Sequence, residues 1–183
     1  MLVGGGPLSS QAGPVSPTRS RVRLGALAIL LTTAGAVYAL DHLIKWVVEQ
    51  HVAYQTQVPS SGPVTIDHVH NTGAAFGLFP QLQTVFLVVA VLVSGYIVLA
   101  GHRFGSGLST QLPLGLVLGG ATANAVDRFR QGYVVDYIDL HRWPVFNLAD
   151  MCIVVGIVAA LFFVVPRAEG PRGDAAIPPG SEG

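Results

Sequence analysis

Four long apolar segments limit what this chain can fold into. They cover residues 24–40, where helical character continues to residue 48, then residues 82–100, 112–126 and about 148–165. The first is long enough to cross about 30 Å of hydrocarbon as a helix. Only 11% of the residues are charged, whereas soluble domains carry about 25%. The sequence therefore predicts an all-α membrane protein with four transmembrane helices.

The two ends of the chain differ from the region between them. Residues 1–23 are rich in Gly, Pro and Ser and then basic, and residues 167–183 are again Gly/Pro-rich. We expect a disordered basic N-terminal tail (1–23), a transmembrane domain (24–166) and a disordered C-terminal tail (167–183). A basic flank before an apolar run is also typical of a secretory signal peptide, and Val37-Tyr38-Ala39 would suit its cleavage. Helical character beyond that point favours a transmembrane helix instead.

Four spans would place both termini on one side of the membrane. Six Lys and Arg residues then fall on the side of the termini and four on the other, so the positive-inside rule predicts cytoplasmic termini. The opposite face collects polar residues from all four segments. These are Asp41, Lys45, Asn71, Asn124, Asp127, Asp136 and Asp150.

Asp136 and Asp150 each follow a short apolar run, and we expect their carboxyl groups to face each other. Two carboxyls a few ångströms apart in a low dielectric tend to share one proton. One can then accept a proton from water while the other hydrogen-bonds a scissile carbonyl, which is the chemistry of an aspartic protease. Asn124 and Asn147 stand three residues before Asp127 and Asp150, so an amide lies beside each acid on a helix face.

Several of these residues also have purely structural interpretations. Asn147 and Asp150 fit a helix N-cap with an acid at its third position. Asp41 and Lys45, four residues apart, fit an ion pair at a helix end. Asp127 and Arg128 fit an interfacial charge pair, and Gly115 and Gly119 fit close helix packing.

Metal and nucleic-acid chemistry find little support in the sequence. His68 and His70 alternate in a candidate strand over residues 64–70, but no third ligand is clear. Cys152 stands alone in an apolar run, and no basic, aromatic-interleaved patch occurs. We therefore predict no metal, no cofactor and no nucleic acid.

Two other functional classes compete with a peptidase. A proton-coupled carrier would need acids near mid-membrane and a broken helix, whereas these acids lie at segment ends. A non-enzymatic scaffold would use Asp150 only as a helix cap and would tolerate replacement of Asp136.

The motifs together resemble those of lipoprotein signal peptidase (signal peptidase II) over about residues 24–165. They are Asp41-x-x-x-Lys45, Asn71-x-Gly73-Ala74-Ala75-Phe76, Gly119-Gly120-Ala121-x-x-Asn124-x-x-Asp127-Arg128, Gly132-x-Val134-Val135-Asp136 and Phe146-Asn147-x-Ala149-Asp150.

The resemblance implies a bacterial inner-membrane aspartic peptidase with its active site at the outer face. It would cut a prolipoprotein before the diacylglyceryl-modified cysteine, so its partners would be that substrate and membrane lipid. Asp136 and Asp150 carry over as the catalytic pair. The supporting or substrate-binding residues would be Asp41, Lys45, Asn71, Gly73, Asn124, Asp127, Arg128 and Asn147. The family also has a small extracytoplasmic β-sheet, which residues 49–70 and 133–146 would supply.

Two departures from the family pattern are visible. Ala123 stands where the family usually has glycine, so helix packing there is expected to be looser. Only 14 positions separate Asp136 from Asp150, which predicts a shortened loop over the site.

Overall fold

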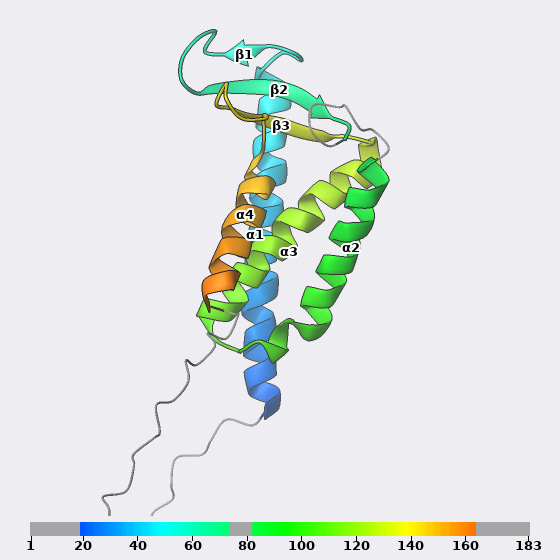
Figure 1. The fold of residues 1–183 in the computed structure, drawn as a ribbon, viewed down its shortest axis with the longest axis vertical. Coiled ribbons are helices and arrows are strands. Elements are labelled where there is room, and N and C mark those ends of the chain that lie inside the picture. The colour runs from blue at the N-terminus through cyan, green and yellow to red at the C-terminus, as the bar shows by residue number, and fades with distance from the viewer. Residues whose placement is uncertain (1–18, 74–81, 164–183) are drawn as a thin grey trace, which may run out of the picture.

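A computed structural model describes residues 19–73 and 82–163. The described helices are α1 (Arg19–His51), α2 (Leu82–Ala100), the 3-10 helix η1 (Gly101–Arg103), α3 (Leu108–Gln131) and α4 (Leu148–Phe163). The strands are β1 (Gln57–Val58), β2 (Thr65–Asn71) and β3 (Val134–Asp139). The long helices run side by side, and the sheet lies across one end of them (Figure 1). This mostly helical architecture with a small sheet agrees with the predicted fold class.

Two helices begin earlier than predicted. α1 begins at Arg19, so residues 19–23 are helical and are not part of a disordered tail. Arginine is a good helix former, and the basic flank simply extends the apolar helix by more than a turn. α3 begins at Leu108, four residues before the predicted apolar segment 112–126, with Gly107 as its N-cap. Residues 1–18 of the predicted N-terminal tail and all of the predicted C-terminal tail (167–183) lie outside the described residues.

The sheet is antiparallel in the order β1-β2-β3. Val69 pairs with Asp136 and Asn71 with Val134, and a register shift interrupts the ladder between Ile66 and Val69. The candidate strand over residues 64–70 is confirmed to within one residue. Since the end of β2 lies beside the start of β3, the pairing brings Asn71 close to Asp136, which is 65 positions away in the sequence.

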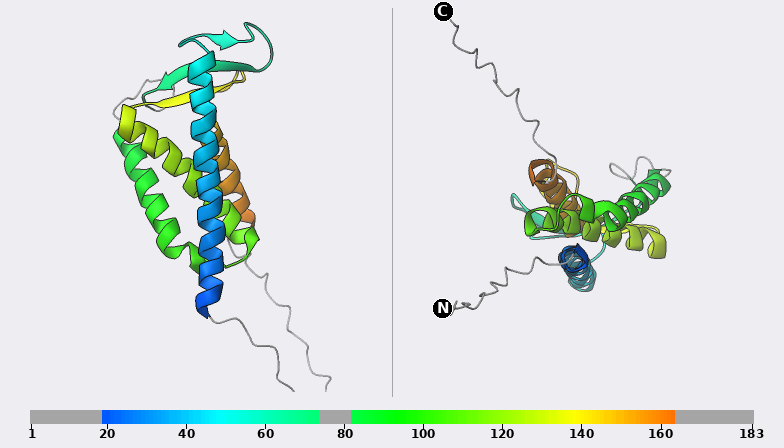
Figure 2. Two further views of the ribbon diagram at one scale, coloured as in Figure 1. Left: turned by 180° about the vertical axis from the view of Figure 1, so that it is seen from behind. Right: turned by 90° about the horizontal axis from the view of Figure 1, so that it is seen from below.

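α3 packs against α1, α2 and α4 and forms the centre of the helical part (Figure 2). Its glycines permit a close approach, as predicted. A Cβ at Gly119 would lie 2.7 Å from the backbone oxygen of Ala34 in α1 and 2.7 Å from the Cβ of Val37. One turn further along, Ala123 is fully buried. The α1–α3 contact is therefore set by residue size.

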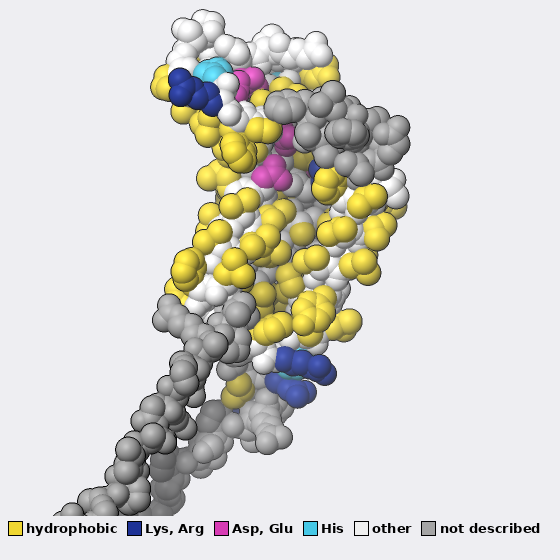
Figure 3. Space-filling view, viewed as in Figure 1, with side chains coloured by type: hydrophobic (Ala, Val, Ile, Leu, Met, Phe, Trp, Pro, Cys, Tyr) yellow, Lys and Arg dark blue, Asp and Glu magenta, His cyan; other side chains and the backbone are white. Residues whose placement is uncertain are grey.

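The outer faces of the helices are apolar. Figure 3 shows hydrophobic side chains covering most of the helical part on this face. Large side chains of α2 and α4 remain exposed to the surroundings, among them Val88, Val89, Leu92, Tyr96, Leu99, Val154, Val155, Leu161 and Phe162. In the described part of the chain, the helices over residues 21–51 and 84–103 have the length and hydropathy of membrane spans. Such an exterior suits hydrocarbon rather than water.

The α1–α3 contact yields a test of the helix packing. We expect Gly119→Ala to lower the thermal unfolding temperature in detergent, because overpacking a close contact costs about 1–3 kcal/mol. Gly95→Ala is the matched control, since a Cβ at Gly95 meets nothing within 4 Å and alanine favours the helix. A Gly119→Ala protein as stable as the Gly95→Ala protein would contradict this account of the packing.

Candidate functional site

Two acidic side chains meet where the sheet joins the helices. Asp136 is the third residue of β3 and is 2% exposed, and Asp150 is the third residue of α4 and is half-buried. Asp136 Oδ2 accepts a hydrogen bond from Asn71 Nδ2 (2.8 Å), and its Oδ1 accepts one from Asn147 Nδ2 (2.6 Å). Asp150 Oδ1 accepts a hydrogen bond from Asn124 Nδ2 (2.7 Å). Each carboxyl is thus held by amide donors from other elements.

Asn147 has both of the roles considered for it. Its Oδ1 accepts the backbone N–H of Asp150 (2.9 Å), and Asp150 Oδ2 accepts the backbone N–H of Asn147 (3.3 Å). These reciprocal bonds form a capping box at the start of α4. The same side chain donates through Nδ2 to Asp136 and to Asn124 Oδ1 (3.2 Å). The cap therefore also links the two acids.

The start of α4 is fixed by three different parts of the chain. The first backbone N–H groups of a helix lack partners within the helix. Here Leu148 donates to the hydroxyl of Tyr137 (3.0 Å), Ala149 donates to Asp41 Oδ1 (2.9 Å), and Asp150 donates to Asn147. Contacts with β3 and α1 thus fix the position of the first turn, and with it the position of Asp150.

A buried lysine connects α1 to the site. Lys45 is 4% exposed, and its Nζ lies 2.5 Å from Asp41 Oδ2, 2.6 Å from Asp127 Oδ2 and 3.1 Å from Asn124 Oδ1. Asp41 and Asp127 are also buried. The predicted Asp41–Lys45 pair is present and extends to α3. Because Asn124 accepts from Lys45 and donates to Asp150, the lysine also orients an amide of the site.

Burial raises the pKa of Asp136 from its ordinary value to about 7, and the nearby negative charge of Asp150 adds to this rise. Hydrogen bonds from Asn71 and Asn147 and the charge of Lys45 act in the opposite direction but only in part. Below neutral pH, Asp136 therefore holds a proton near a second carboxyl. This is the protonation state that the sequence suggested for a pair sharing one proton.

Arg128 does not pair with Asp127, contrary to one structural interpretation of the sequence. Asp127 instead bonds Lys45, with His42 Nε2 at 3.3 Å. Arg128 Nη1 donates to the backbone oxygen of Asn124 (3.3 Å), and its buried Nε has no hydrogen-bond partner among the described residues. The guanidinium also lies over the Phe86 ring.

A cleft of about 470 Å³ opens beside Asp150 between α2, α3 and α4. One end is polar and is lined by Asn71, Gly73, Asn124, Arg128 and Asp150, and the remainder is lined by apolar side chains such as Phe86, Val93, Val117 and Ile157. Gly73 donates its N–H to Asn71 Oδ1 (3.0 Å), which orients the Asn71 amide. Acidic side chains are visible at the upper end of this face in Figure 3.

The structure brings together all ten residues singled out in the sequence. Two contributors were missed. Tyr137 caps α4, and His42 contacts Asp127. Tyr137 directly follows a predicted catalytic residue, which was the only local signal for it. His42 lies next to Asp41, and nothing in its spacing pointed to Asp127.

The sequence and the fold of this chain are both similar to those of known proteins. The family model described as "Signal peptidase (SPase) II" matches residues 33–165. A "Lipoprotein signal peptidase" of Moorella thermoacetica is 44% identical over 146 residues, covering 78% of this chain and 97% of that protein. One from Serratia marcescens is 37% identical over 165 residues, covering 84% and 93%. A solved "Bacterial membrane enzyme structure" is 24% identical with a TM-score of 0.65, over 73% of this chain and 90% of that one.

The buried lysine gives a test of how this site is held together. We expect Lys45→Met to destabilise the protein by about 3–5 kcal/mol, because it leaves two buried carboxylates without their cation. The readout is thermal unfolding in detergent. Arg130→Met is the matched control, since Arg130 is an exposed cation on α3 and exposed substitutions usually stay within about 0.5 kcal/mol. Equal effects of the two substitutions would contradict the role given to Lys45.

Proposed function

Because this chain belongs to the signal peptidase II family, it removes signal peptides from prolipoproteins, and we propose that Asp136 and Asp150 are the catalytic pair. The observation that carries this proposal is a pair of neighbouring, hydrogen-bonded carboxyls, of which Asp136 is buried and Asp150 lines the polar end of an apolar cleft. The raised pKa of Asp136 supports a pair that holds one proton at neutral pH.

In the proposed reaction, the ionised carboxyl of the pair takes a proton from a water molecule, and the water oxygen attacks the scissile carbonyl carbon. The protonated carboxyl donates a hydrogen bond to the carbonyl oxygen and stabilises the negative charge that develops there. The tetrahedral intermediate then collapses, and a proton passes from the pair to the leaving amine. The step needs neither a covalent intermediate nor a metal, so we propose that cleavage is metal-independent.

The neighbouring residues have separate proposed roles. Asn71 and Asn147 hold the Asp136 carboxyl in one orientation, and Asn124 holds that of Asp150. Asp41, Lys45 and Asp127 are positioning residues, because they act through Asn124 and the start of α4. Arg128 has an unpaired Nε at the cleft, and we propose that it binds a backbone carbonyl of the substrate. Gly73 leaves room beside Asn71 for that backbone.

The cleft suits a substrate that is polar at the cut and apolar on one side of it. We propose that its apolar walls on α2, α3 and α4 hold the hydrophobic segment of the signal peptide, with membrane lipid as a further partner. The diacylglyceryl-modified cysteine would follow the cut bond. A cleft that is open to the membrane would let a lipid-modified chain enter sideways, without passing through water.

We further propose that α3 and α4 span the membrane together with α1 and α2. The start of α1 and η1 lie at the end opposite the sheet (Figure 1), and this end carries Arg21, Arg23 and Arg103. By the positive-inside rule this end is cytoplasmic. The sheet and the acids then face outward, which is where a bacterial inner-membrane enzyme would meet a translocated prolipoprotein.

The catalytic pair is tested by replacing each acid with its amide. We expect Asp136→Asn and Asp150→Asn each to reduce cleavage of a diacylglyceryl-modified prolipoprotein by at least about 1,000-fold, because an amide cannot share or relay the proton. The assay uses purified protein in detergent whose folding is verified by its thermal unfolding transition.

Asp139→Asn is the matched control, because Asp139 lies three residues beyond Asp136 on β3 and pairs with His141 rather than with the site. It should cleave like the unmodified protein, and EDTA should leave cleavage unchanged. Cleavage that survives in either Asp136→Asn or Asp150→Asn would show that the wrong acid has been assigned, and Asp127 would be the next to test.

A further inference from the structure

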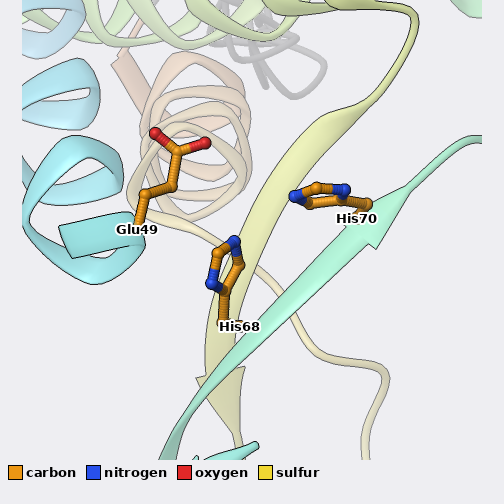
Figure 4. A group of neighbouring side chains, drawn as sticks. All are labelled: Glu49, His68 and His70. Atoms are coloured by element: carbon orange, nitrogen blue, oxygen red, sulfur yellow. The ribbon is translucent and has the colours of Figure 1, made fainter. Parts of the chain in front are cut away.

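Outside the cleft, one acidic and two histidine side chains come together where α1 meets β2. Glu49 lies in the last turn of α1, and His68 and His70 lie on β2. One ligand atom from each of the three lies within 4.8 Å of the others. Figure 4 shows the Glu49 carboxyl and a ring nitrogen of each histidine pointing toward a common space. The sequence offered two histidines without a third ligand, and the fold supplies that ligand from 19 positions away.

His68 is prepared for binding a metal. His68 is only 7% exposed, and its Nδ1 lies 2.8 Å from the backbone oxygen of Val52. A carbonyl can only accept, so Nδ1 carries the proton and Nε2 carries the lone pair. This Nε2 is buried and has no hydrogen-bond partner among the described residues. An orphaned buried acceptor is costly, and metal-binding histidines usually have a carbonyl on their other nitrogen.

His70 is held in place by ring contacts rather than by hydrogen bonds. Its ring stacks on Tyr133 with centroids 3.8 Å apart and an interplanar angle of 16°, and Tyr54 packs on it at 4.4 Å. These contacts fix the ring with a nitrogen facing the space shared with Glu49 and His68 (Figure 4).

We propose that Glu49, His68 and His70 form a Zn²⁺ site that joins the end of α1 to β2. Two imidazoles favour zinc and related transition metals over magnesium or calcium. Zinc bonds of 2.0–2.2 Å bring ligand atoms in a tetrahedral site to about 3.3 Å of one another. Glu49 is exposed at a helix end, so its flexible side chain can move the remaining distance. Water would take the fourth position.

The ion would be structural rather than catalytic. None of its three ligands bonds Asp136 or Asp150 in the described part of the chain, and the amide of Asn71, the residue after His70, already holds Asp136. Zinc binding fixes the sheet to α1 and so steadies β2. Cleavage itself does not depend on the ion, and the zinc site and the peptidase site can therefore be tested separately.

The test is zinc binding by the full chain, purified in detergent without a polyhistidine tag and stripped of metal. We expect calorimetric titration with Zn²⁺ to show one ion per chain and thermal unfolding to shift upward when zinc is added. Co²⁺ should give the visible absorption of a four-coordinate site. Glu49→Gln and His70→Phe, which preserve size and ring stacking, should each weaken zinc binding at least 10-fold and abolish the thermal shift.

His51→Gln is the matched control, since His51 is an exposed histidine two residues beyond Glu49 on α1. It should bind zinc as the unmodified protein does. Failure of the unmodified chain to bind zinc would overturn the proposal, as would undiminished binding in both Glu49→Gln and His70→Phe. Neither result bears on Asp136 or Asp150, because binding is measured without substrate.

Discussion

Three asparagine amides hold two neighbouring carboxyl groups in this protein. Asn71 and Asn147 donate to Asp136, and Asn124 donates to Asp150. Without these donors, carboxyls next to hydrocarbon would carry an unpaired polar group or charge, which is costly in a low dielectric. The amides come from β2, from the start of α4 and from α3. The site therefore exists only when these elements have assembled, and the same bonds hold the sheet to the helices.

The buried Lys45 extends this dependence to α1. It bonds Asp41, Asp127 and Asn124, and Asp41 in turn accepts an N–H at the start of α4. A lysine in such a place is strongly disfavoured unless it is fully paired. The close α1–α3 packing that glycine permits at Gly119 brings the two helices near enough for that pairing. Packing by small residues and pairing of charges thus support one another across the same helix contact.

Features that depend on neighbouring residues could be predicted from the sequence, and the clustering of the ten site residues followed from the order of the segments and the family resemblance, but distant contacts outside that set could not be predicted. The apolar runs predicted the helices, and the alternation of polar and apolar residues predicted β2. The spacing of Asn147 and Asp150 predicted the cap of α4. The start of α1 at Arg19 was misplaced, because a basic flank can extend a helix as well as end it. Tyr137 at the start of α4 and Glu49 beside the two histidines were missed, since each acquires its role only through a partner on another element.

We propose above that Asp136 and Asp150 hold one proton between them. Infrared difference spectroscopy measures it directly, because a protonated carboxyl absorbs apart from a carboxylate. Burial raises the pKa of Asp136 to about 7, so the carboxyl band should be present below neutral pH and disappear as the pH rises through about 7. In Asp136→Asn, this pH-dependent change of the carboxyl band should be absent. A band that is absent throughout, or that titrates unchanged in Asp136→Asn, would contradict the shared proton.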